Sequence, residues 1–79
     1  MLTEYIRAAL HQAQYEKLED STYYGEIPGL QGVYAGAATL ELCREELQSA
    51  LEDWILFGIA NGFHIPPING IDLNGTKVA

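Results

Sequence analysis

Residues 39–62, TLELCREELQSALEDWILFGIANG, decide the fold because they predict one amphipathic helix of about six turns. Thr39 is a suitable N-cap, since its hydroxyl can accept a hydrogen bond from a free backbone N–H of the first turn. Asn61 and Gly62 tolerate left-handed backbone, and Pro66 follows where no helix continues. The rest of the chain is expected to pack around this helix.

The predicted helix has a core face and an outer face that changes along its length. The side chains on the core-facing arc are Leu40, Cys43, Leu47, Ala50, Leu51, Trp54, Phe57 and Gly58. Ile55, Leu56 and Ile59 stand on the side that carries charged residues two turns earlier, so a second surface must cover them. We expect these three residues to form an oligomer interface, in a homodimer or a dimer of dimers. The alternative is that the N-terminal helix or residues 63–68 fold back over them.

The bulk properties predict one small acidic domain, residues 1–79, that needs help to be stable. Its single Cys43 excludes an internal disulfide. The net charge of −7, from 11 acidic and 4 scattered basic residues, disfavours nucleic acid and anionic membranes and favours a basic partner, although such charge also serves solubility. Residues 1–4 lack a basic signal region and no apolar run approaches the ~20 residues of a membrane span, so a cytoplasmic location is expected.

The remaining segments predict an α+β fold, in which one antiparallel sheet packs on the long helix. Apolar residues recur at helical spacing in a short N-terminal helix, and strand-forming residues follow it. Gly25 is expected to leave room for a large side chain such as Trp54. The predicted segments are an N-terminal helix at 1–12, a core at 13–73 with strands at 13–18, 22–27 and 33–35 and a fourth around 71–73, and a loose tail at 74–79.

The sequence holds no motif of a hydrolase, a phosphate-binding loop or a cysteine–histidine metal site. His11 and His64 are interpreted as structural or solvent-facing. The hairpin carboxylates could hold a divalent metal, but a solvated acidic face is the commoner arrangement; they are Glu16, Glu19, Asp20 and Glu26. The tyrosines could stack on RNA bases, yet the lack of nearby cations favours sheet packing or a protein interface. We therefore expect no enzymatic activity, no catalytic residue, no cofactor and no metal.

The succession YYGEIPGLQGV at 23–33, then Gly36 and TLELC at 39–43, resembles the HicB-like antitoxin family over about residues 13–73. The resemblance implies a partial ribonuclease-H-like fold without nuclease activity. It also implies binding to a HicA-like toxin, a small basic protein that cleaves messenger RNA, whose active histidine such antitoxins block.

Four residues are expected to bind the partner, and the chain departs from the commonest family pattern. Tyr24, Glu26, Pro28 and Tyr34 are the expected partner-binding residues. Full-length members often carry a C-terminal DNA-binding segment, and nothing after Asp72 could form one, so binding to duplex DNA without a partner is not expected. Short solitary members need not have a toxin, which leaves a stand-alone oligomeric protein as the alternative.

Overall fold

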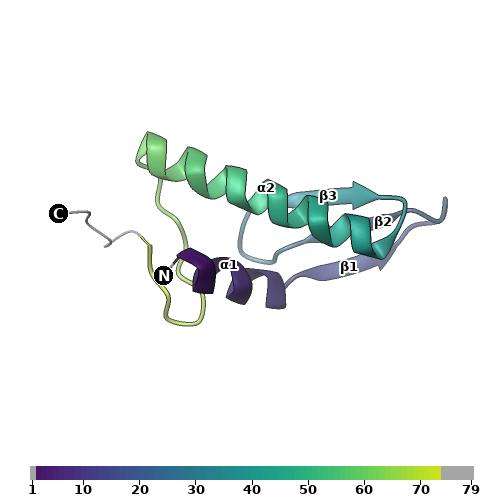
Figure 1. Cartoon of the computed structure of the whole chain (residues 1–79), viewed down its shortest axis with the longest axis horizontal. Coiled ribbons are helices and arrows are strands. Elements are labelled where there is room, and N and C mark those ends of the chain that lie inside the picture. The colour runs from purple at the N-terminus through teal and green to yellow at the C-terminus, as the bar shows by residue number, and fades with distance from the viewer. Residues whose placement is uncertain (1, 74–79) are drawn as a thin grey trace.

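A computed structural model describes residues 2–73 and, within them, two helices and one three-stranded antiparallel sheet (Figure 1). This arrangement confirms the predicted α+β class. The predicted loose tail at 74–79 lies outside the described residues. In chain order the elements are α1 (Leu2–His11), β1 (Gln14–Lys17), β2 (Tyr23–Glu26), β3 (Tyr34–Ala37) and α2 (Leu40–Asn61).

The sheet has the strand order β1-β2-β3, with Gly25 paired to Tyr15 on one side and to Ala35 on the other. The β1–β2 turn is closed by Asp20, whose carboxylate accepts hydrogen bonds from the backbone N–H of Thr22 at 3.0 Å and from its hydroxyl at 2.6 Å. Short side chains of this type stabilise turns by bonding nearby backbone. The hairpin therefore forms where its turn residues predict it.

The long helix begins and ends at the predicted caps. The Thr39 hydroxyl accepts a hydrogen bond from the Leu42 N–H at 3.1 Å, which satisfies one of the free donors of the first turn. At the other end Gly62 adopts the left-handed conformation with φ 69°, and its N–H bonds back to carbonyls of the last turn. Neither α1 nor α2 has the length and apolarity that crossing a bilayer requires.

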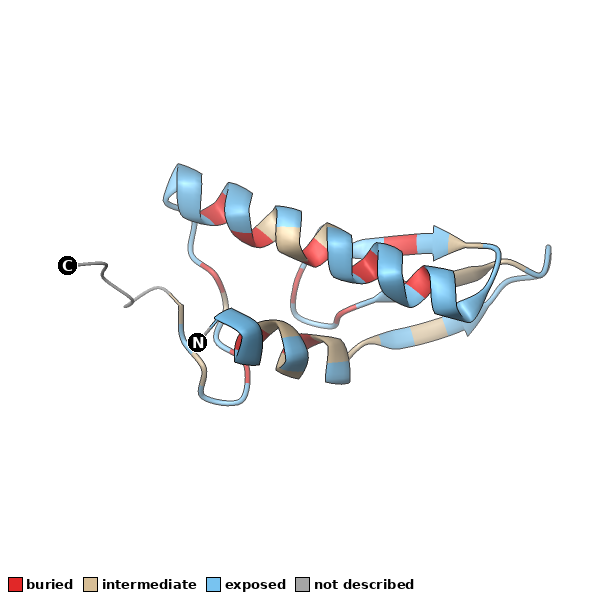
Figure 2. Cartoon of the chain, in the orientation of Figure 1, coloured by how far each residue is buried: buried red, intermediate tan, exposed pale blue. Residues whose placement is uncertain are grey.

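One face of the sheet packs on α2, and α1 lies alongside α2 (Figure 1). Figure 2 shows the buried positions of α2 as a stripe along its inner side. Tyr5 of α1 is fully buried, and its hydroxyl donates to the Pro66 carbonyl at 2.6 Å. The buried apolar side chains are Tyr5, Ala9, Ile27, Leu30, Val33, Ala35, Cys43, Leu47, Leu51, Ile55, Ile65 and Ile68.

The predicted core face of α2 was wrong at its edges. Ile55, assigned to an oligomer interface, is only 1% exposed within its own chain, whereas Leu40 and Phe57, assigned to the core, are exposed. The reason is that α1 and the segment after α2 cover the Ile55 side: Ile55 lines a hollow with Leu2 of α1, and Ile65 contributes to the same core. The fold-back alternative is therefore correct for Ile55.

Two other predictions need correction. The space over Gly25 is filled by Tyr15, because a Cβ at Gly25 would lie 2.8 Å from the Tyr15 ring; Trp54 instead lies beside Gly32. The fourth strand around residues 71–73 does not form within the described residues. Ile71 pairs only with Ile68, three residues earlier, as an isolated bridge in a tight turn.

Candidate functional site

The face of the sheet turned away from α2 is open. Successive residues of a strand point to opposite faces, so Tyr15, Gly25 and Ala35 face α2 and their neighbours face solvent. We call this second set the open sheet face; its residues are Gln14, Glu16, Tyr24, Glu26, Tyr34 and Gly36. It presents two tyrosines and two carboxylates with no basic side chain among them, so it is an aromatic and negatively charged surface.

Tyr24, Glu26 and Tyr34 hold one another in place on this face. The Tyr24 hydroxyl donates to Oε1 of Glu26 at 2.9 Å, and the Tyr24 ring stacks on Tyr34 with the ring centroids 6.3 Å apart. The hydrogen bond to the Glu26 carboxylate raises the pKa of Tyr24, with the negative charge of Glu26 adding to it. The register brings the trio together because Glu26 pairs with Tyr34 across the strands.

The loop after β2 extends this surface. Ile27, Leu30 and Val33 are buried and fix the loop to the core, while Pro28 is exposed beside β2. A hollow of ≈ 220 Å³ is lined by the loop together with Tyr24, Glu26, Pro28 and Tyr34. The structure therefore brings all four predicted partner-binding residues to one place. That they bind a partner stays a prediction.

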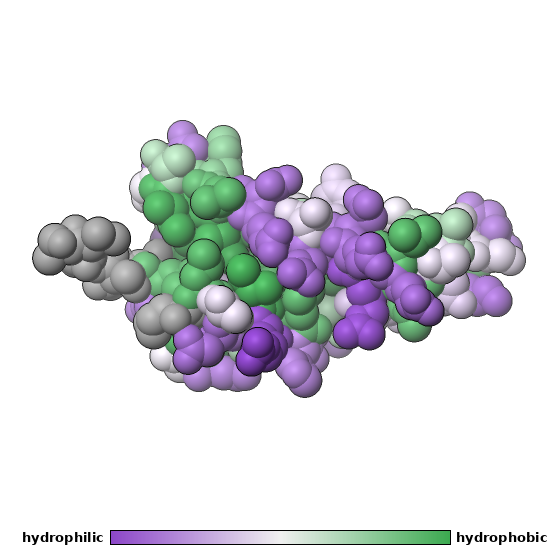
Figure 3. All heavy atoms as spheres, viewed as in Figure 1, coloured by the Kyte–Doolittle hydropathy of each residue, from purple (hydrophilic) through white to green (hydrophobic). Residues whose placement is uncertain are grey.

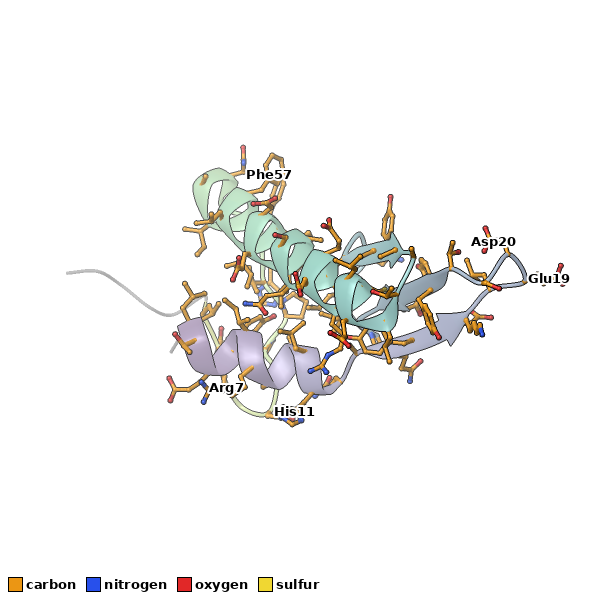
Figure 4. All side chains as sticks on the ribbon, turned by 45° about the vertical axis from the view of Figure 1, so that its right-hand side comes forward. Arg7, His11, Glu19, Asp20 and Phe57 are labelled. Atoms are coloured by element: carbon orange, nitrogen blue, oxygen red, sulfur yellow. The ribbon has the colours of Figure 1, made fainter. Side chains whose placement is uncertain are left out.

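A second candidate surface is apolar and lies at the C-terminal end of α2. We call it the apolar end and define it by Leu56, Phe57, Ile59 and Phe63, which are 62%, 58%, 57% and 58% exposed. Figure 3 shows apolar residues gathered over this end of α2, and Figure 4 shows Phe57 pointing away from α1. The rings of Phe57 and Phe63 are in contact, with centroids 5.5 Å apart. Leu56 and Ile59 are exposed, as predicted.

Sequence reasoning missed Phe57 and Phe63 as surface residues. Phe57 lies about 100° round the helix from Leu56 and Phe63 follows the C-cap, so both border the apolar outer side. The position of Phe63 could have been predicted from Gly62, because a left-handed C-cap glycine turns the next residue back against the last helical turn. In the structure the Phe63 N–H bonds to the Gly58 carbonyl in that turn at 2.9 Å.

The acidic residues of the hairpin do not converge. Glu19 and Asp20 lie at its tip (Figure 4), whereas Glu16 and Glu26 lie on the open sheet face. The Thr22 hydroxyl holds the pKa of the Asp20 carboxyl below its ordinary value. In residues 2–73 no three His, Cys, Asp or Glu side chains are grouped closely enough to hold a metal ion.

The thiol and three of the basic side chains lie away from both surfaces, whereas His64 lines a hollow that Ile59 and Phe63 of the apolar end also line. Cys43 is buried under the sheet, where its thiol lies 3.6 Å from the Ala35 carbonyl and burial raises its pKa. Arg7, His11 and Arg44 line one hollow between α1 and α2, so two of the four basic residues are less scattered than predicted. His64 lies in a different hollow, beyond the end of α2.

Comparison with known proteins identifies a family and one close structural relative. The family model described as UPF0150-like matches residues 4–66. The crystal structure of TTHA0281 from Thermus thermophilus is 42% identical in sequence, covers 96% of this chain and 95% of its own, and superposes with a TM-score of 0.88. No curated protein matches the chain.

Proposed function

The chain belongs to the UPF0150-like family, and we propose that it acts as a HicB-like antitoxin, a protein that neutralises a small basic mRNA-cleaving toxin by binding it directly. The observation that carries the proposal is the open sheet face, where Tyr24, Glu26, Pro28 and Tyr34 line one hollow. The resemblance to HicB-like antitoxins in residues 13–73 supplies the identity of the partner class. A cytoplasmic location follows, since the toxin acts on messenger RNA.

The chemistry of the open sheet face suits a cationic protein. Tyrosine is enriched in protein interfaces because one rigid side chain offers both apolar area and a polar end. The Tyr24 hydroxyl orients Glu26, so this carboxylate loses little side-chain freedom when it accepts hydrogen bonds from an Arg or Lys of a partner. The net charge of −7 speeds the approach of such a partner.

We propose that the chain has no catalytic activity of its own. The thiol of Cys43 is buried, and the imidazoles of His11 and His64 lie in separate hollows. The proposal is tested by incubating the protein with RNA and DNA in Mg²⁺ and Mn²⁺. We expect no cleavage; cleavage that is lost in Glu16→Gln or Asp20→Asn would overturn the proposal.

Binding to duplex DNA without a partner is also not expected. Affinity for DNA is dominated by neutralised phosphates, and only Arg7, Arg44 and His11 share a site among the described residues. Micromolar binding to the promoter of its own operon at physiological salt would contradict this statement. For an anionic membrane surface the same charge argument holds.

The toxin hypothesis is tested by titrating the purified chain, in a calorimeter, with the small basic protein encoded beside it. Glu26→Lys should weaken binding at least about tenfold, or ~1.4 kcal/mol, because it places a cation in the contact with a basic partner. Glu45→Lys is the matched control, since it makes the same charge change on the outer side of α2. Equal losses in both variants would mean that net charge, not the open sheet face, governs binding.

A second candidate function is a stand-alone oligomeric protein without a toxin. The exposed apolar end of α2 favours it, because that surface calls for a protein contact whether or not a toxin exists. The two functions differ in one observation. A neighbouring gene that encodes a small basic protein with a double-stranded-RNA-binding pattern and a lone histidine supports the antitoxin, and the absence of such a gene supports the alternative.

A further inference from the structure

The apolar end of α2 is large for a surface that meets only water. Its four side chains are each more than half exposed, and together they present on the order of 400 Å², taking about 200 Å² for one large side chain. An apolar patch of this size matches the largest one on a typical soluble monomer, and such patches are often functional. Two copies meeting there would cover twice that area, which approaches the roughly 1,000 Å² of a specific interface before the flanks are counted.

Hollows lie beside the protruding side chains of the apolar end. The exposed side chain of Leu56 borders a hollow of ≈ 240 Å³ that is lined mainly by the apolar Leu2, Ile6 and Ile55, with Glu52 at its side. Ile59 and Phe63 border a second hollow of ≈ 370 Å³ beyond the last turn. A two-fold interface requires one patch that carries both protruding side chains and places to receive them. This end of the molecule has both.

The distribution of charge favours a second copy over a different protein. A basic partner is attracted to the carboxylates of the open sheet face, and none of the four residues that define the apolar end carries a charge. Two copies that meet at this end keep their acidic hairpin tips, at Glu19 and Asp20, at the far ends of the pair (Figure 4). This separation of the hairpin carboxylates reduces the repulsion between two chains of charge −7.

We infer that two copies of the chain pair through Leu56, Phe57, Ile59 and Phe63, in an end-to-end homodimer. In this dimer α2 meets its symmetry mate at its C-terminal end, and both open sheet faces stay uncovered because they lie on the opposite side of the sheet from α2. The dimer thus carries two separate faces for a partner. The inference stands independently of the identity of that partner.

Sedimentation equilibrium of the full chain at tens of micromolar tests the pairing. The wild type should have twice the mass of the 8.7 kDa chain, and Leu56→Glu should be monomeric. Leu42→Glu is the matched control, because Leu42 is also an exposed leucine of α2 but lies at its other end, so this variant should remain a dimer. A folded wild-type monomer, a dimeric Leu56→Glu variant or a monomeric Leu42→Glu variant would each overturn the inference.

A milder pair of substitutions covers the case in which Leu56→Glu does not fold. Leu56→Ala with Ile59→Ala removes protruding atoms without adding charge, and both positions are exposed, so circular dichroism at low concentration should match the wild type. Its dimer dissociation constant should rise at least about tenfold, as truncation of central interface residues commonly does. An unchanged dissociation constant in this folded variant would contradict the proposed interface.

Discussion

Both halves of α2 contribute to one core, but their solvent-exposed residues differ in polarity. Residues 40–53 bury Cys43, Leu47 and Leu51, and residues 54–61 bury Ile55 and Gly58. On the outer side the first half carries charged residues such as Glu45 and Asp53, whereas the second half carries Leu56, Phe57 and Ile59.

The inner and outer faces of α2 therefore meet different surroundings. The core face is determined by the chain's own sheet, by α1 and by the segment around Ile65. On the outer face Leu56, Phe57 and Ile59 stay more than half exposed among the described residues, so their chemistry indicates what they contact beyond the monomer. Water suits the first half and a protein surface suits the second.

The largest expected effect tests whether the two halves contribute equally to the core. Leu47→Ala and Ile55→Ala should each lower the free energy of unfolding by about 2–5 kcal/mol, because both side chains are fully buried. Leu42→Ala, at an exposed position of the first half, should change it by less than about 0.5 kcal/mol. Urea denaturation measures all three. If Ile55→Ala matched Leu42→Ala, the second half would not belong to the core.

Two glycines at the end of the second half should respond in opposite directions. Gly62→Ala should destabilise the fold by about 1–2 kcal/mol, because φ there is 69° and a side chain strains the left-handed conformation. Gly58→Ala should stabilise it by about 0.5–1 kcal/mol through helix propensity, since its Cβ would make ordinary contact with Ile65 at 3.5 Å. Thermal unfolding of both variants gives the comparison, and a shift in the same direction for both would refute it.

The start of the first half should depend on one hydroxyl. Thr39→Ala removes the hydrogen bond that Oγ1 accepts from the Leu42 N–H and should cost about 1 kcal/mol of unfolding free energy. Thr39→Ser keeps an acceptor at this position and should lose much less. A Thr39→Ser variant as unstable as Thr39→Ala would show that the methyl group, rather than the cap, matters.

The smallest expected effect is a pH dependence from Cys43 in the first half. Burial raises the pKa of this thiol in the folded protein, whereas the unfolded thiol ionises near ~8.5. The stabilising contribution is therefore full below that value and is lost as pH rises through the folded pKa. The free energy of unfolding should fall more steeply between about pH 8 and 10 in the wild type than in Cys43→Ala. Parallel slopes would exclude this source of pH dependence.

Local signals in the sequence were enough for the boundaries of α2 and for the β1–β2 hairpin. Thr39, Gly62 and Asp20 act on backbone groups within a few residues of themselves, so their effect does not depend on the rest of the fold. Four residues of the open sheet face and its adjoining loop, Tyr24, Glu26, Pro28 and Tyr34, were predicted to bind a partner before the face itself was known. The pairing of Glu26 with Tyr34 then brought the predicted residues into one hollow.

The errors arose where a distant part of the chain decides the outcome. Which side of α2 is covered depends on where α1 and Ile65 pack, and the periodicity of residues 40–61 carries no information on that. Phe57 was therefore predicted to be buried and is exposed, whereas Ile55 was predicted to lie outside the core and is buried. Gly25 marked a gap without showing that Tyr15, its cross-strand partner, would fill it. The predicted strand around Ile71 does not join the sheet, and Ile71 pairs with Ile68 instead.

The hydrogen bond from the Tyr5 hydroxyl to the Pro66 carbonyl joins residues 61 positions apart in the sequence. A ribosome makes Tyr5 before Pro66, so during translation this bond and the complete cover of the buried face of α1 must wait until Pro66 has emerged. The sheet and the start of α2 can form earlier, because their contacts connect closer residues. Docking of the first helix is then among the last steps of folding, and a nascent chain stalled before Pro66 exposes the apolar side of α1 to chaperones.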